Sequence, residues 1–191
     1  MSATPILYCS HCGAKVEYRI PPGETVVRAV CPACHIIHYQ NPKIVAGCIV
    51  EWQGDILLCR RAIEPRRGLW TIPAGFMELG ESTEEAAARE TLEEAKAVVD
   101  IYSLYAVFSL PHVGQVYVVF RGRLRTSEYG VGEESLEVQM TSLDKIPWNE
   151  LAFPVIREIL ERYVKDREQP HSGAHFASLS PSSPSHPYED A

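Results

Sequence analysis

The sequence lacks three features that would each assign it to a class of protein. It has no apolar run long enough to cross a bilayer, which argues against a membrane protein. It has no charged segment followed by an apolar run and a cleavage site, so we expect a cytoplasmic protein, although a removed transit peptide is compatible with this start. It also lacks basic excess: 18 Lys and Arg face 25 Asp and Glu, and the net charge of −7 makes a nucleic-acid partner unlikely because such binding needs basic surface.

The composition that is present suits a globular protein with a tail. With 191 residues, of which 46% are hydrophobic, the chain can build one main core and a small satellite domain. In the last 22 residues, six serines and four prolines leave too little apolar surface to offset chain entropy. We therefore predict a disordered Ser/Pro-rich tail over residues 169–191.

Two cysteine pairs near the N-terminus have the spacing of a structural zinc site, C-x2-C, eighteen residues, C-x2-C. Disulfides are the alternative, and we favour zinc because nothing else in the chain indicates secretion. Residues 16–20 and 25–30 between the pairs read as two short strands joined by a Pro-Pro-Gly turn. We predict a zinc ribbon over residues 1–41, with a structural or dimerising role. Its zinc ligands would be Cys9, Cys12, Cys31 and Cys34.

Three carboxylates further along the chain share one face of a predicted helix. Glu90, Glu93 and Glu94 stand at i, i+3 and i+4, where like charges repel and weaken the helix. A bound divalent cation would remove that repulsion, since Mg²⁺ prefers oxygen ligands. A solvated acidic surface is the simpler reading of the helix taken alone. The preceding strand and glycine loop, LWTIPAGFMELGES, favour the metal site.

The start of this helix is marked by a capping box. Ser82 is a suitable N-cap, and Glu85 follows three residues later. The helix should therefore begin near Thr83.

This region resembles the signature of the Nudix hydrolases. Gly75, five residues, Glu81, seven residues and then RETLEE over 89–94 follow the G-x5-E-x7-R-E-U-x-E-E-x-G-U pattern. Thr91 replaces an aliphatic residue, and Lys96 replaces a glycine that would end the helix. The two departures leave the end of the helix open but keep every carboxylate.

The resemblance implies an α+β fold, the Nudix α/β/α sandwich with a mixed sheet, and a site for Mg²⁺ or Mn²⁺. Glu93 and Glu94 would be the main ligands, and Glu90 would be a further ligand or would orient the attacking water. The Gly75 carbonyl would also bind the metal. Two further residues would support this site, Arg89 by an ion pair with Glu93 and Glu81 by bracing the loop.

In several members of this family an acidic residue on a later loop approaches the metal. Here the corresponding segment, 126–137, contains Glu133, Glu134 and Glu137, and we choose Glu137 as the one near the metal. Four arginines before the signature either contact substrate phosphates or belong to a solvated loop. They are Arg60, Arg61, Arg66 and Arg67.

The rest of the chain reads as alternating strands and one amphipathic helix, which completes a Nudix domain over residues 42–168. The apolar residues of 154–165 are spaced for one buried helix face. The predicted strands are 44–52, 56–61, 98–110 and 116–125.

Three further segments narrow the substrate that the resemblance implies. HYQNPKIVAG, GQVYVVFRGRL, and ESLEV followed by IPWNELAFP are similar to the plant chloroplast FAD pyrophosphatase group. FAD or ADP-ribose would then be cleaved at the diphosphate to release AMP. An NADH pyrophosphatase, whose SQPWPFP-like segment is absent, or a nucleoside triphosphate sanitising hydrolase are alternatives. A non-enzymatic regulator is disfavoured because all the signature glutamates are present. Many members of the family are dimers, so we expect a homodimer acting on a small nucleotide.

Overall fold

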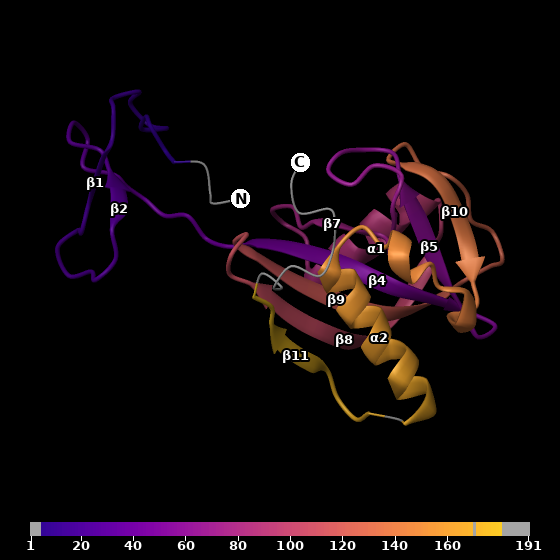
Figure 1. Ribbon diagram of the computed structural model, residues 1–191. Coiled ribbons are helices and arrows are strands. Elements are labelled where there is room, and N and C mark those ends of the chain that lie inside the picture. Colours follow the sequence, from indigo (N-terminus) through magenta and orange to yellow (C-terminus); the bar gives the residue numbers. More distant parts are fainter. Residues whose placement is uncertain (1–4, 170, 181–191) are drawn as a thin grey trace. The chain divides into compact units, whose positions relative to one another are not determined.

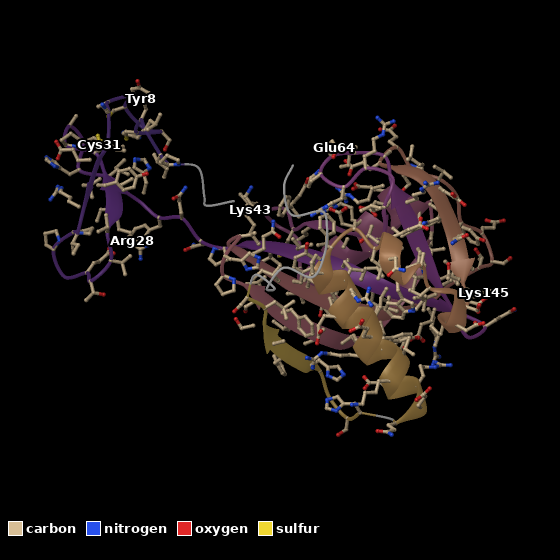
Figure 2. The ribbon with its side chains drawn as sticks, viewed as in Figure 1. Tyr8, Arg28, Cys31, Lys43, Glu64 and Lys145 are labelled. Atoms are coloured by element: carbon tan, nitrogen blue, oxygen red, sulfur yellow. The ribbon has the colours of Figure 1, made fainter. Side chains whose placement is uncertain are left out.

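The computed structural model describes residues 5–169 and 171–180. These described residues form two compact units, one of those up to residue 42 together with 112–114, and one of those in 43–111 and from 115 onward (Figure 1). Figure 2 shows the side chains of both units and labels Lys43, the first residue of the main sheet. Within the described residues, no helix is both long enough and apolar enough to cross a membrane.

The N-terminal unit is a small antiparallel sheet over a cluster of cysteines. Its strands, in the order β1-β2-β3, are β1 (Glu17–Arg19), β2 (Arg28–Val30) and β3 (Ile37–His38). Cys9, Val16, Ala29 and Cys31 are buried together beside this sheet. So small an apolar cluster leaves much of the unit's stability to another source.

The main unit is a mixed eight-stranded sheet, which confirms the predicted fold class. Six strands lie in the order β10-β5-β4-β9-β8-β11, and the short strands β6 and β7 pair with β5 and β4. β4 runs parallel to β9, and β11 runs parallel to β8, while the other pairs are antiparallel. The strands are β4 (Lys43–Trp52), β5 (Asp55–Arg61), β6 (Trp70–Thr71), β7 (Ala74–Phe76), β8 (Val99–Leu110), β9 (Gln115–Leu124), β10 (Ser135–Thr141) and β11 (His175–Ser178).

Two helices pack on this sheet, α1 (Thr83–Ala95) and α2 (Pro154–Glu168), and two 3-10 turns, η1 (Leu143–Lys145) and η2 (Trp148–Glu150), precede α2. The small residues of α1, such as Ala87, pack with Cys48 and Phe120 from β4 and β9. Successive side chains of a strand point to opposite faces of the sheet, so Arg121 and Phe120 of β9 lie on opposite faces. Arg121 contacts the ring of Tyr163, which belongs to α2. The two helices therefore cover opposite faces of the sheet. As predicted, α2 buries one stripe: Val155, Ile156, Ile159, Leu160 and Tyr163.

The segment after α2 differs from the disorder predicted for 169–191. Residues 175–178 form β11 on the edge of β8, and His175 Nε2 lies 2.7 Å from Asp166 Oδ2. The composition argument weighed buried apolar surface, whereas this strand is held by backbone hydrogen bonds to a sheet edge and by a side-chain contact. The rest of the predicted tail, 181–191, lies outside the described residues.

Candidate active site

The helix α1 is fixed at its N-terminus by the predicted capping box. The Glu85 backbone N–H donates to Ser82 Oγ at 3.2 Å, and the Ser82 N–H donates to Glu85 Oε2 at 2.7 Å. Two otherwise unpaired helix N–H groups are satisfied in this way. The box sets the start of the helix at Thr83, and with it the direction in which the later glutamates point.

The C-terminal end of α1 lies where the signature has glycine. Lys96 takes the left-handed conformation, with φ 50° and ψ 26°, and its N–H donates to Leu92 O at 2.9 Å. The next loop then satisfies two more helix carbonyls, as Gly130 N–H donates to Ala95 O at 2.7 Å and Gly132 N–H to Glu94 O at 2.9 Å. The lysine thus adopts the backbone shape that glycine would supply.

Arg89 is the centre of an ion-pair network on the next turns of α1. Its Nη1 donates to Glu90 Oε1 at 2.8 Å and to Glu93 Oε2 at 3.0 Å, which is the ion pair we predicted. Its Nε and Nη2 donate to both oxygens of Glu81, at 3.0 and 2.8 Å, and Nη2 also reaches Phe76 O at 3.1 Å. One guanidinium therefore ties the helix to the glycine loop.

Glu81 braces the loop as expected. Besides Arg89, its Oε1 accepts the Glu78 backbone N–H at 2.6 Å. The Arg89 guanidinium and this N–H together hold the pKa of Glu81 down at about 2. Glu81 is therefore ionised at any physiological pH and keeps Arg89 in place.

Glu90 and Glu94 are buried carboxylates, 9% and 6% exposed. Burial, and then the charge of Glu90, raises the pKa of Glu94 to about 8. Burial also raises the pKa of Glu90, against the opposing effect of Arg89. Two desolvated acids of like charge are stable side by side only when one of them keeps its proton or when a cation neutralises them. Their oxygen-only chemistry fits a hard divalent cation such as Mg²⁺.

Gly75, the predicted backbone ligand, lies in β7 directly against Glu90. A Cβ at this position would stand 2.3 Å from the Glu90 carboxyl carbon. Only glycine allows this approach, so the backbone of Gly75 and the carboxylate of Glu90 lie side by side. The structure thus brings together two of the four predicted metal ligands.

Glu93 does not join the two buried acids at one point. Its side chain is 58% exposed and is held by Arg89. Across the described residues, the only group of three or more His, Cys, Asp or Glu whose ligand atoms lie within 4.8 Å of one another is the cysteine cluster. The roles of Glu90, Glu93 and Glu94 as ligands therefore stay predictions.

Among the three loop acids, Glu134 rather than Glu137 acts electrostatically on these glutamates. The charge of Glu134 acts on both Glu90 and Glu94 and helps to raise their pKa values. Glu137 instead lies in β10 opposite Arg60 of β5, and its Oε2 is 3.6 Å from Arg60 Nη1. Glu137 follows a register shift after Ser135, and our choice of it as the acid near the metal stays a prediction.

Arg61, like Glu134, is a residue near the acidic site to which the sequence assigned no single role. Burial raises the pKa of Glu94, and the positive charge of Arg61 partly opposes that rise. The Arg61 Cζ lies 5.1 Å from the centre of the Phe153 ring. The Arg61 Nε donates to Pro65 O at 3.0 Å. Of the four arginines, Arg61 is thus placed in electrostatic reach of the acidic site, while Arg60 is held by Glu137 and by Gly68 O.

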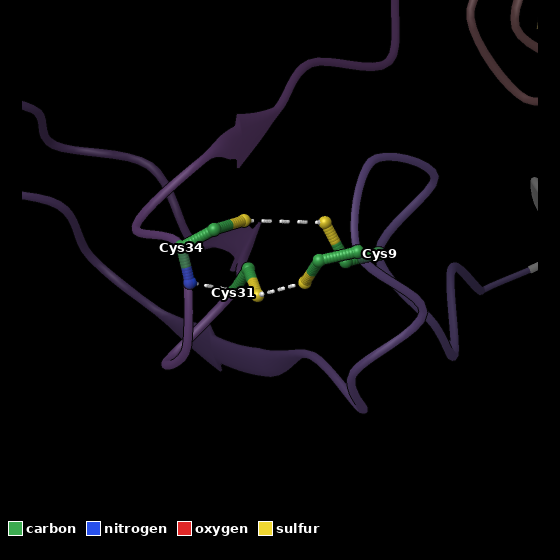
Figure 3. Close-up of side chains that lie close together, drawn as sticks. Cys9, Cys31 and Cys34 are labelled. Carbon is green, nitrogen blue, oxygen red and sulfur yellow. Dashed lines mark hydrogen bonds between the residues drawn. The ribbon is translucent and has the colours of Figure 1, made fainter.

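The four N-terminal cysteines converge in a separate cluster (Figure 3). Cys9 Sγ lies 3.6 Å from Cys34 Sγ, and Cys12 Sγ lies 3.4 Å from Cys31 Sγ. Four thiolates around zinc, with bonds of about 2.3 Å, stand about 3.8 Å apart, so the arrangement fits Zn²⁺. All six cysteines of the chain lie within the described residues and are free, which removes the disulfide alternative.

The backbone prepares one of these thiols for metal binding. The Cys34 N–H donates to Cys31 Sγ at 3.4 Å and lowers the pKa of the Cys31 thiol to about 6. A thiol with that pKa is largely thiolate at neutral pH, the form that binds zinc.

Comparison with known proteins matches both units to family models. Residues 7–40 match the model described as Nudix N-terminal, a zinc ribbon, and residues 41–163 match that of the NUDIX domain. A crystal structure of a NUDIX hydrolase from Nitrosomonas europaea is 52% identical, with a TM-score of 0.88, over 91% of this chain and 99% of that one.

Two curated relatives are more distant. An ADP-ribose pyrophosphatase of Methanocaldococcus jannaschii is 33% identical over 134 residues, 67% of this chain and 74% of the relative. An NAD-capped RNA hydrolase NudC of Salmonella heidelberg is 27% identical over 160 residues, 82% of this chain. The chain spans 60% of the length of that second relative.

Proposed function

The chain belongs to the NUDIX domain family and is a Nudix pyrophosphatase, and from this premise we propose that it hydrolyses the diphosphate bond of FAD or ADP-ribose, releasing AMP. Water adds to one phosphorus as the bridging P–O bond breaks. The products are AMP with FMN, or AMP with ribose 5-phosphate. The observation that carries this proposal is the pair of buried acids, Glu94 and Glu90, of which Glu90 lies against the backbone of Gly75.

The proposed metal ligands are Glu90, Glu93, Glu94 and the Gly75 carbonyl. Mg²⁺ or Mn²⁺ held by these residues would supply positive charge for the phosphate oxygens and would lower the pKa of a water molecule. Arg89 positions the carboxylates of Glu90 and Glu93, because one Nη1 group binds both. Glu90 orients the attacking water, and Glu134, whose charge helps to raise the pKa of Glu90, is the loop carboxylate proposed to assist it.

Substrate choice is supported by the curated relatives and by the three sequence segments. ADP-ribose and NAD, which appear in the relatives' names, both contain an adenosine diphosphate group. FAD contains the same group, and the plant chloroplast-like segments favour FAD. An NADH pyrophosphatase would release AMP as well, whereas a nucleoside triphosphate sanitising hydrolase would release pyrophosphate. A Mg²⁺-dependent assay on FAD, NADH, ADP-ribose and dGTP separates these possibilities when the release of AMP and of pyrophosphate is measured for each substrate.

The matched test of the site compares two glutamates of α1. Glu94→Gln removes a buried ligand charge and should reduce turnover by roughly a hundredfold or more, because the developing phosphate charge loses metal stabilisation. Glu84→Gln alters an exposed glutamate of the first turn, whose Oε2 accepts a hydrogen bond from the Thr83 hydroxyl at 3.0 Å, and should leave turnover near the wild-type value. Equal rates for the two variants would refute the proposed metal ligands.

The N-terminal ribbon is proposed to bind structural zinc and to contribute to a homodimer in the cytoplasm. The four convergent thiols support the zinc. Sedimentation analysis of the zinc-loaded protein would show whether the chain is dimeric.

A further inference from the structure

A second charged cluster lies where β4 turns into β5, on the sheet face that α2 covers. It surrounds a cavity of about 200 Å³ whose lining includes the exposed Arg123 and Arg167, the half-buried Glu51 and the buried Tyr163. None of these residues belongs to the acidic site.

The carboxylate of this cluster is already fully engaged. Glu51 Oε1 accepts Arg121 Nε at 2.7 Å and the Tyr163 hydroxyl at 2.9 Å, and Oε2 accepts the Tyr102 hydroxyl at 2.8 Å. Burial alone would raise the pKa of Glu51, but these donors outweigh it and lower the pKa. Glu51 is therefore ionised and balanced by Arg121, and it does not neutralise the other arginines.

Two of the arginines near this cavity, Arg121 and Arg123, lie beside the same aromatic ring. The guanidinium carbons of Arg121 and Arg123 lie 5.3 and 5.1 Å from the centre of one ring, that of Tyr102. Arg167 of α2 borders the same cavity. Two cations that share one ring, with a third at the same cavity, give this part of an otherwise acidic chain a local positive charge.

The nearby acids do not cancel this charge. Asp100 stands opposite Arg123 in the β8–β9 register, yet its Oδ1 accepts Arg125 Nε at 2.7 Å. Among the ion pairs of the described residues, Arg121 is paired with Glu51 and Arg125 with Asp100, whereas neither Arg123 nor Arg167 has an ion-pair partner. Arg123 and Arg167 are the two cations left over for a ligand.

We propose that Arg123 and Arg167 bind a phosphate group in this cavity, at a site separate from the acidic cluster. A phosphoryl group carries a charge of about −1.5 to −2 at neutral pH, which matches the local excess. One guanidinium group can donate two parallel hydrogen bonds to the oxygens of a phosphate. The cavity is smaller than the roughly 300–1,000 Å³ of sites for whole drug-sized ligands, so it suits inorganic phosphate or one phosphate of a larger molecule.

The test titrates the full, zinc-loaded chain with inorganic phosphate by calorimetry, at constant ionic strength and without magnesium. Without Mg²⁺ the acidic site repels phosphate, so heat of binding reports the arginine site. We expect one phosphate per chain, and Arg123→Gln or Arg167→Gln should each weaken binding by about tenfold or more.

Arg125→Gln is the matched control, because this arginine directly follows the same strand, β9, but is paired with Asp100. It should bind phosphate nearly as the wild type does. Absence of magnesium-independent binding in the wild type, or equal weakening by all three variants, would overturn the proposal. Circular dichroism verifies that each variant is folded, and the assay does not depend on the proposed hydrolysis.

Discussion

Lys96 ends α1 in a conformation that costs a lysine about 1 kcal/mol or more relative to glycine. We predict that Lys96→Gly raises the free energy of unfolding by about 0.5–1 kcal/mol, because glycine removes that strain. Urea denaturation measures the change. Lys96→Ala deletes the side chain but keeps the strain, so it should not stabilise the protein. A gain in Lys96→Ala equal to that in Lys96→Gly would show that the side chain, rather than φ, is responsible.

The raised pKa of Glu94 predicts a pH dependence of stability in magnesium-free buffer. The folded state keeps this proton up to about pH 8, whereas the unfolded chain releases it near pH 4.3. The folded state therefore binds more protons between these values, and the free energy of unfolding should fall by a few kcal/mol as the pH rises through this window. Denaturation at a series of pH values measures the slope.

The matched variant for this slope is Glu94→Gln, which carries no titrating group at position 94. Its stability should change less between pH 5 and 8 than that of the wild type. Parallel pH profiles for the two proteins would contradict the assignment to Glu94. Added Mg²⁺ should also flatten the wild-type profile, since a bound cation lowers the pKa of its carboxylate ligand.

At the scale of elements, the loop after β9 is docked on the end of α1 through Gly132. A Cβ there would lie 1.8 Å from Glu93 O, which no side-chain adjustment can relieve. We predict that Gly132→Ala displaces this loop, lowers stability by about 2–4 kcal/mol and reduces turnover, because the same loop carries Glu134. Thermal unfolding and the substrate assay measure the two effects.

Gly130→Ala is the control for that substitution. Its Cβ would meet Lys96 Cβ at 3.7 Å, an ordinary contact. It should therefore change stability by less than about 1 kcal/mol and leave turnover nearly intact. Similar losses in both variants would mean that loop flexibility, and not the clash at Gly132, matters.

Contacts within one helix could be predicted from the sequence, whereas contacts between distant strands could not. The capping box of Ser82 and Glu85 and the Arg89–Glu93 pair depend on residues three or four positions apart, so helix geometry alone specifies them. The placement of Glu134 and Arg61 depends on how β10 registers with β5 across a bulge, and β11 depends on a free edge of β8. Such contacts join distant segments, and no local pattern encodes them.

For the whole molecule, the two units have separate cores and should lose structure separately. Cys31→Ser removes one of the proposed zinc ligands, and we predict loss of zinc and unfolding of the N-terminal unit, because metal binding supplies the folding energy of such small domains. Elemental analysis should find one zinc per chain in the wild type and much less in the variant. The main unfolding transition should persist, since its core contains none of these cysteines.

Cys48→Ala is the comparison for this variant, because Cys48 is a buried thiol of the main core. It should keep the zinc and lower the main transition instead. Retention of zinc by Cys31→Ser would argue against the ribbon as a metal domain.

All residues of the acidic site, from Gly75 to Glu134, come from the main unit, and the N-terminal unit supplies none of them. Mutations in the ribbon can therefore accumulate, or one ribbon can be exchanged for another, while the hydrolytic residues are inherited unchanged. Natural selection can in this way change the zinc-ribbon unit on one part of the gene and the acidic site on the other.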